Sequence, residues 1–160
     1  MRGTDPAHHI HITEQGEPGV IGLAFYVSSE ADLTAVAESA EGASGIEEIN
    51  EPGGGKRVQV RDPNGLAIEF VCDVASVAPL PVPSNVLNTG HNKLARTGTL
   101  LRVDQRPSRV KRIGHAVIST PYLEQTVAWA HHHLGVIKSD DVHAEDNPKE
   151  LIGSFNRVND

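Results

Sequence analysis

The fold of this chain is decided by the stretch Val20-Ile21-Gly22-Leu23-Ala24-Phe25-Tyr26-Val27-Ser28, which is echoed by Arg112-Ile113-Gly114-His115-Ala116-Val117-Ile118-Ser119-Thr120. Both copies are predicted to be strands that lead into a helix. The pattern Ile-Gly-x-Ala is kept, but Leu23 of the first copy becomes His115 in the second. A leucine can only pack, whereas an imidazole can bind a metal ion or move a proton. The repeat predicts two copies of one structural unit, and only the second copy keeps the chemically active side chain.

The residues around the first copy predict the order β-α-β-β-β between residues 20 and 72. Ser28 or Ser29 can cap a helix that runs through Glu41. A short strand is expected at residues 46–50, and two longer ones at 57–61 and 66–72. The last two are joined by Asp62-Pro63-Asn64-Gly65, in which every residue favours a tight turn.

The second copy predicts the same unit without its last strand. A strand at residues 112–119 leads into a helix that opens at Thr120 and Pro121 and ends near Leu134. Strands are expected at residues 136–142 and 151–158, and there the chain stops. We therefore divide the sequence into an N-terminal strand and turn (1–19, with the strand at 8–13), a complete module (20–75), a linker rich in proline and arginine (76–111), and an incomplete module (112–160).

Composition and charge exclude several classes of protein. The net charge of −7 argues against a general binder of nucleic-acid phosphates. The sequence contains neither a secretory signal nor an apolar run of 18 residues, so we expect a soluble, cytoplasmic protein without a membrane span. The single cysteine, Cys72, fits a reducing compartment and is expected to be buried and inert.

Several motifs occur together in one order along the chain. They are Gly114-His115 in a strand, Trp129 in a helix, Leu134-Gly135 at its end, the hairpin Asp62-Pro63-Asn64-Gly65 with Ile68-Glu69, and the late strand Gly153-Ser154-Phe155-Asn156-Arg157. In combination they resemble the vicinal oxygen chelate superfamily, which includes glyoxalases, bleomycin-resistance proteins and type I extradiol dioxygenases. The linker followed by His115 looks most like the junction between the two domains of an extradiol dioxygenase.

The resemblance implies an α+β fold of paired βαβββ modules, one complete and one incomplete, that enclose a metal or ligand cavity. It also implies that this segment is short at both ends relative to the family. The family's iron site takes a His from the first strand of this module, and a His and a Glu from the next module. Only the first ligand maps onto this sequence, at His115, and the other two would lie beyond Asp160. The implied metal is Fe(II), with another divalent ion as the alternative.

Other candidate ligands are weighed against plainer roles. Glu69 occupies the last-strand position where the family often places a carboxylate ligand, but its module has Leu23 where the imidazole should be. Glu69 is therefore a candidate metal ligand whose alternative is a remnant or a surface residue. His9 and His11 would share one face of a strand and could bind a metal, or they could form a polar face. His131, His132 and His133 diverge around a helix, so we expect them to be exposed and unable to chelate one ion together.

Two functions follow from the resemblance. The first is a metal-dependent extradiol dioxygenase or glyoxalase-like enzyme, an oxidoreductase in the former case, that acts on a small aromatic or other small molecule. The second is a non-catalytic module that binds a small molecule or mediates assembly. Because one βαβββ module exposes a large apolar sheet face, we expect either homo-oligomers or pairing of the two units with an open edge strand.

Overall fold

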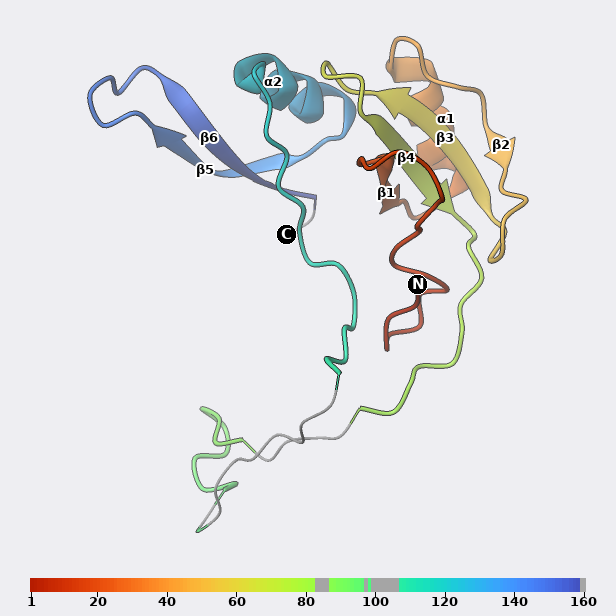
Figure 1. Cartoon of the computed structure of the whole chain (residues 1–160), viewed down its shortest axis with the longest axis vertical. Coiled ribbons are helices and arrows are strands. Elements are labelled where there is room, and N and C mark those ends of the chain that lie inside the picture. The colour runs from red at the N-terminus through yellow and green to blue at the C-terminus, as the bar shows by residue number, and fades with distance from the viewer. Residues whose placement is uncertain (83–86, 97, 99–106, 159–160) are drawn as a thin grey trace. The chain divides into compact units, whose positions relative to one another are not determined.

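The computed structural model describes residues 1–82, 87–96, 98 and 107–158 (Figure 1). It forms two compact units, one of Met1–Thr13 with Ser76–His115, the other of Glu14–Ala75 with Ala116–Asp160. Every helix and strand of the described residues lies in the second unit.

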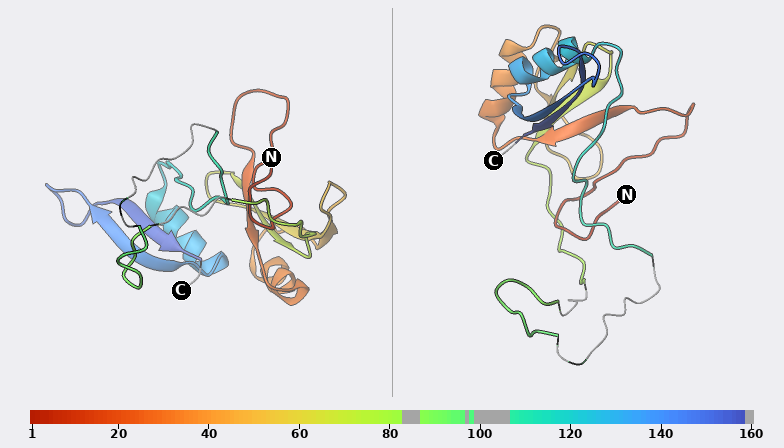
Figure 2. Two further views of the ribbon diagram at one scale, coloured as in Figure 1. Left: turned by 90° about the horizontal axis from the view of Figure 1, so that it is seen from below. Right: turned by 90° about the vertical axis from the view of Figure 1, so that its left-hand side faces the viewer.

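The second unit contains a complete βαβββ module, as predicted. Its elements are β1 (Gly22–Tyr26), α1 (Glu30–Ser39), β2 (Glu47–Glu48), β3 (Lys56–Arg61) and β4 (Ala67–Cys72). The four strands form one sheet in the order β1-β4-β3-β2. β1 runs parallel to β4, and the other neighbours are antiparallel. α1 packs against β3 and β4 and covers one face of this sheet (Figure 2).

Local side-chain chemistry explains where these elements begin and turn. Ser29 caps α1 in a capping box, because its hydroxyl accepts from the Asp32 backbone N–H while the Asp32 carboxylate accepts from the Ser29 N–H. In the β3–β4 turn, the buried Asp62 carboxylate accepts hydrogen bonds from the backbone N–H groups of Asn64 and Leu66, both at 2.8 Å. Gly65 adopts the positive φ of 82° that this turn requires.

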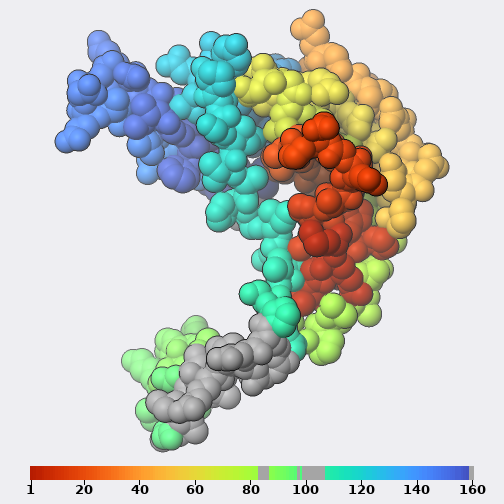
Figure 3. Space-filling model, in the orientation of Figure 1, coloured from red at the N-terminus to blue at the C-terminus, as the bar shows by residue number. Residues whose placement is uncertain are grey.

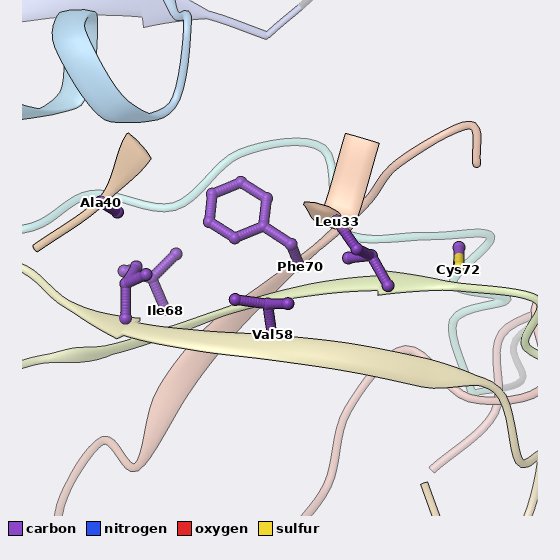
Figure 4. Packing of buried hydrophobic residues seen from close by; sticks show 7 residues of the cluster. Leu33, Ala40, Val58, Ile68, Phe70 and Cys72 are labelled. Atoms are coloured by element: carbon purple, nitrogen blue, oxygen red, sulfur yellow. The ribbon is translucent and has the colours of Figure 1, made fainter. Parts of the chain in front are cut away.

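The core lies between α1 and the sheet and is mainly aliphatic. Leu33 and Val58 are fully buried, and Ile68, Phe70 and Cys72 surround them (Figure 4). Burial raises the pKa of the Cys72 thiol, and the neighbouring Asp73 charge adds to the shift. The free cysteine therefore stays protonated and inert, as the sequence predicts.

From Ala116 onward, the incomplete module also lies in the second unit, whereas residues 112–115 belong to the first. It consists of α2 (Leu123–His133), β5 (Ile137–His143) and β6 (Leu151–Arg157), and the two strands pair antiparallel. The helix and both strands were predicted close to these bounds.

The modules pair through α2, since Trp129 and Leu134 pack against the core of the first module. The Asn64 amide donates to the Thr126 hydroxyl at 3.1 Å.

The predicted strand at residues 112–119 is wrong, because these residues form no strand. In the complete module, β1 is held in the sheet by β4 alone. Residues 112–158 contain no counterpart of β4, so the second copy of the repeat has no strand with which to pair. Residues 112–119 keep the apolar pattern of a strand, but they lack the backbone hydrogen bonds to a neighbouring strand that define one.

The predicted strand at residues 8–13 is also wrong. The backbone N–H groups of Ile10 and His11 both donate to the Met1 carbonyl, which bends this segment into a loop. Only an isolated bridge between Ala7 and Ser76 has strand character here. Residues 76–111 contain no helix or strand where they are described, and residues 83–86, 97 and 99–106 of this predicted linker lie outside the described residues.

Candidate functional site

The register of β1 and β4 decides which side chains share a face of the sheet. Leu23 is paired with Ile68 and Phe25 with Phe70, so both β1 side chains lie on the face that α1 covers. Glu69 is paired with Ala24 and lies on the opposite face. Leu23 packs, as expected, but it does not occupy the place of an imidazole partner for Glu69. That part of the sequence interpretation is wrong, because neighbouring residues on a strand face opposite sides.

Glu69 belongs to a polar network on the open face of the sheet. Its carboxylate accepts a hydrogen bond from the Gln59 side-chain amide at 2.5 Å and lies 3.6 Å from the Arg57 guanidinium. Arg57 also pairs with Glu47 at 3.4 Å and Glu51 at 3.7 Å. The Glu69 side chain keeps 29% of its surface exposed. These contacts provide hydrogen-bond and ion-pair partners for the Glu69 carboxylate, as expected for a structural residue. None of these partners is an imidazole.

His115 is placed differently, in an extended segment of the first unit. Its side chain is exposed and makes no hydrogen bond or ion pair with any described residue. Both ring nitrogens are therefore open to solvent and free to bind a ligand. Because His115 and Glu69 belong to different units, each is a separate candidate.

The N-terminal histidines do not form the predicted pair. The His8 and His9 rings contact each other edge to face, with their Nδ1 atoms 3.2 Å apart. Burial lowers the pKa of His9, and the neighbouring His8 lowers it further. His11 instead lies 3.1 Å from the Thr13 hydroxyl. Without a strand, the alternation that would place His9 and His11 on one face does not exist.

The helix histidines contribute to packing more than the sequence predicts. His132 is exposed, but His131 and His133 are half-buried. The His131 Nε2 atom lies 2.9 Å from the Asn156 side-chain oxygen, which links α2 to β6. The His133 ring lies beside Trp129, with 5.4 Å between ring centroids. The expectation that all three are exposed is wrong, because the last turn of α2 faces its own hairpin.

No set of ligands for a metal ion is complete within the part of the chain that the structure describes. No three His, Cys, Asp or Glu side chains in that part gather as metal ligands do. Catalytic metal sites usually have three protein ligands, and structural zinc sites have four. The described residues therefore show no complete ligand set around His115 or Glu69.

Residues of both copies of the repeat line an apolar hollow, which the sequence analysis did not identify. It has a volume of about 380 Å³ and lies within the second unit. Its lining consists of Val20, Leu23 and Leu66 from the first module, Ala116, Val117 and Ile118 from the second, and the polar Asn64 and Ser119. The repeat could have indicated this hollow, because both of its apolar copies contribute side chains to the lining. Such a surface suits a small apolar molecule.

A matched pair of substitutions tests the assignment of faces. Leu23→His places an imidazole against the core and is expected to cost about 1–3 kcal/mol of unfolding free energy. Ala24→His places it opposite Glu69 on the open face and is expected to change stability by less than about 0.5 kcal/mol. Only the second variant brings an imidazole and a carboxylate together, so only it should gain Zn(II) affinity. Urea unfolding and calorimetric Zn(II) titration measure both effects, and tighter binding by Leu23→His would contradict the register.

Comparison with known proteins supports the fold. No protein-family model and no curated protein matches this sequence. The structure is similar to the Mn(II)-bound glyoxalase from Novosphingobium aromaticivorans, with a TM-score of 0.62 and 22% sequence identity. The match covers 89% of this chain and 40% of that chain, so the chain spans less than half the length of the glyoxalase. The predicted α+β fold with βαβββ modules of the glyoxalase type is confirmed.

Within the described ranges, neither helix has the length and apolar character needed to cross a membrane.

Proposed function

We propose that this chain is part of a divalent-metal-dependent enzyme of the glyoxalase and extradiol dioxygenase type, to which it contributes His115 as one metal ligand. The observation that carries the proposal is the fold shared with a Mn(II)-bound glyoxalase over 89% of the chain. The exposed and unbonded imidazole of His115 supports it. The remaining ligands come from residues outside the described part of this chain.

The proposed metal and substrate follow from the same resemblance to glyoxalases and extradiol dioxygenases. Imidazole and carboxylate ligands suit Mn(II) and Fe(II), with Fe(II) expected for ring cleavage. A divalent ion in an open site polarises substrate oxygen atoms. A small molecule with two neighbouring oxygens, such as a catechol, is the substrate class proposed for the dioxygenase alternative.

The experiment uses the protein encoded by the gene's full reading frame, loaded with Mn(II) or Fe(II). It is assayed for cleavage of catechol to the yellow ring-fission product and for isomerisation of a hemithioacetal. Loss of one metal ligand through His115→Ala is expected to lower kcat/KM on the order of a hundredfold or more. His132→Ala, which removes an exposed histidine of α2, is the matched control and should retain activity. Equal activity of the two variants would refute the role of His115.

The second candidate is a non-catalytic module that binds a small molecule. The apolar hollow favours it, because binding there requires no metal. Val117 lines the hollow and is 90% exposed, so Val117→Asp should abolish binding of an apolar fluorescent probe without unfolding the chain. His115→Ala should leave probe binding unchanged. A large loss of binding in His115→Ala would count against this candidate.

A further inference from the structure

The turn between β3 and β4 contains Asn64-Gly65, the single Asn-Gly pair of the sequence. Both residues are exposed, and Gly65 has a positive φ of 82°. Glycine carries no side chain, so its backbone nitrogen approaches a neighbouring group without hindrance from a Cβ atom. In an Asn-Gly pair, this nitrogen can attack the side-chain amide of the asparagine, which is among the thermally labile groups of proteins. The turn therefore holds the position of this chain most open to deamidation.

The Asn64 side chain joins this turn to the second module. Its amide nitrogen donates to the Asp62 carboxylate at 2.8 Å and to the Thr126 hydroxyl at 3.1 Å. Its side-chain oxygen accepts a hydrogen bond from the Thr120 hydroxyl, and the two threonine hydroxyls lie 3.4 Å apart. We refer to Asn64, Thr120 and Thr126 as the amide latch. Figure 3 shows the turn, in yellow, against the residues that begin α2, in cyan.

The latch restrains the amide that would have to react. Both N–H groups of the Asn64 side chain are bonded, one within the turn and one to the second module. The Gly65 backbone N–H donates to the Asp62 carbonyl at 2.9 Å. Attack requires the side chain to turn toward Gly65 and to give up its bonds to Thr120 and Thr126. Contact between the modules therefore protects the amide, and separation of the modules releases it.

We propose that Asn64 is a deamidation site that the second module protects, so that the modification marks copies in which the two modules have separated. A bond forms between the Gly65 nitrogen and the Asn64 Cγ, and ammonia leaves with the proton of that nitrogen. Water then opens the cyclic imide to aspartate or isoaspartate. Water is the only co-reactant.

Deamidation prevents the latch from forming again. A carboxylate at residue 64 has no N–H to donate to Asp62 or Thr126. It also places a negative charge beside the Asp62 carboxylate, and like charges repel. The modification is therefore irreversible in its effect on the contact between the modules. It depends on the contacts of Asn64 and is independent of the metal proposal.

The first test measures the deamidation rate of the 160-residue chain at mildly alkaline pH, by mass spectrometry of the peptide that contains residue 64. The folded chain is expected to deamidate at least about tenfold more slowly than the same chain in urea, because several hydrogen bonds restrain the amide. Thr126→Val removes one latch hydroxyl and should raise the rate of the folded chain about fivefold, the effect of one hydrogen bond. Thr34→Val is the matched control and should leave the rate unchanged, because the Thr34 hydroxyl donates to the Glu30 carbonyl within α1 and lies outside the latch.

Equal rates in the folded and unfolded chains would overturn the proposal, as would equal rates for Thr126→Val and Thr34→Val. Leu33→Ala separates release of the latch from unfolding of the whole chain, because it weakens the core and keeps every residue of the latch. If Leu33→Ala accelerated deamidation more than Thr126→Val, unfolding of the whole chain would control the rate, and the proposed protection by the latch would be wrong.

The second test examines the effect of the modification and does not depend on the reaction rate. Trp129 is the single tryptophan of the chain and packs against the core of the first module, so its fluorescence reports on contact between the modules. Asn64→Asp should shift the emission to longer wavelength, because Trp129 gains contact with water when the modules separate. Asn50→Asp makes the same change of charge at an exposed residue outside the latch and should emit like the native chain. Equal emission from the two variants would overturn the proposed effect.

Discussion

Leu33→Ala is expected to lower the free energy of unfolding by about 3 kcal/mol, within the range of about 2–5 kcal/mol found for buried leucines. Leu33 is fully buried and is the residue through which α1 enters the core beside Val58, Ile68 and Phe70. Truncation leaves a cavity that the sheet cannot fill without moving. Because small domains have about 5–15 kcal/mol of stability in total, a loss of this size is severe.

Urea unfolding of the full chain, followed by circular dichroism, measures this loss. Leu87→Ala removes the same atoms from a leucine that is 51% exposed, and it should cost less than about 0.5 kcal/mol. Equal costs for the two substitutions would show that Leu33 does not hold α1 against the sheet.

Gly55→Ala is expected to destabilise the chain by more than about 2 kcal/mol, because a strained backbone and a close contact coincide there. Gly55 precedes β3 with a φ of +102°. A Cβ atom at this position would lie 2.5 Å from the Cys72 carbonyl oxygen and 3.0 Å from the Val74 backbone nitrogen. The end of β4 would therefore have to move away from β3.

Gly45→Ala is the matched control, because nothing lies within 4 Å of its Cβ position and its φ is not in the left-handed region. That substitution should be neutral or slightly stabilising, since alanine reduces the freedom of the unfolded chain. Thermal unfolding of both variants gives the comparison. A Gly55→Ala variant as stable as Gly45→Ala would contradict the close approach of β3 and β4.

The elements that the sequence predicts correctly are those whose signals are local. Ser29 and Asp32 define the start of α1 by their own hydrogen bonds, and Asp62 organises the β3–β4 turn within a few residues. The strands at 8–13 and 112–119 fail for the opposite reason. Their patterns are suitable, but a strand requires a partner, and no local signal reveals that the partner is lacking.

Only part of the candidate site could be predicted from the sequence. The face of the sheet on which a side chain lies depends on the register of strand pairing, which the sequence does not specify. The repeat aligns Leu23 with His115 by sequence, and this suggested that Leu23 occupies the place of a ligand beside Glu69. Pairing of Ala24 with Glu69 places Leu23 on the other face of the sheet. The polar network of Glu69, Gln59 and Arg57 joins strands whose pairing the sequence does not specify. The exposed position of His115 agrees with a ligand role.

The central proposal is that this chain supplies one metal ligand, His115, to a site that residues outside its described part complete. Electron paramagnetic resonance of Mn(II) added to the 160-residue chain tests it most directly. We predict that the spectrum stays that of the hydrated ion at equimolar protein, because no three ligands gather among the described residues. Stoichiometric binding of one Mn(II) per chain, with a dissociation constant in the micromolar range, would contradict the claim.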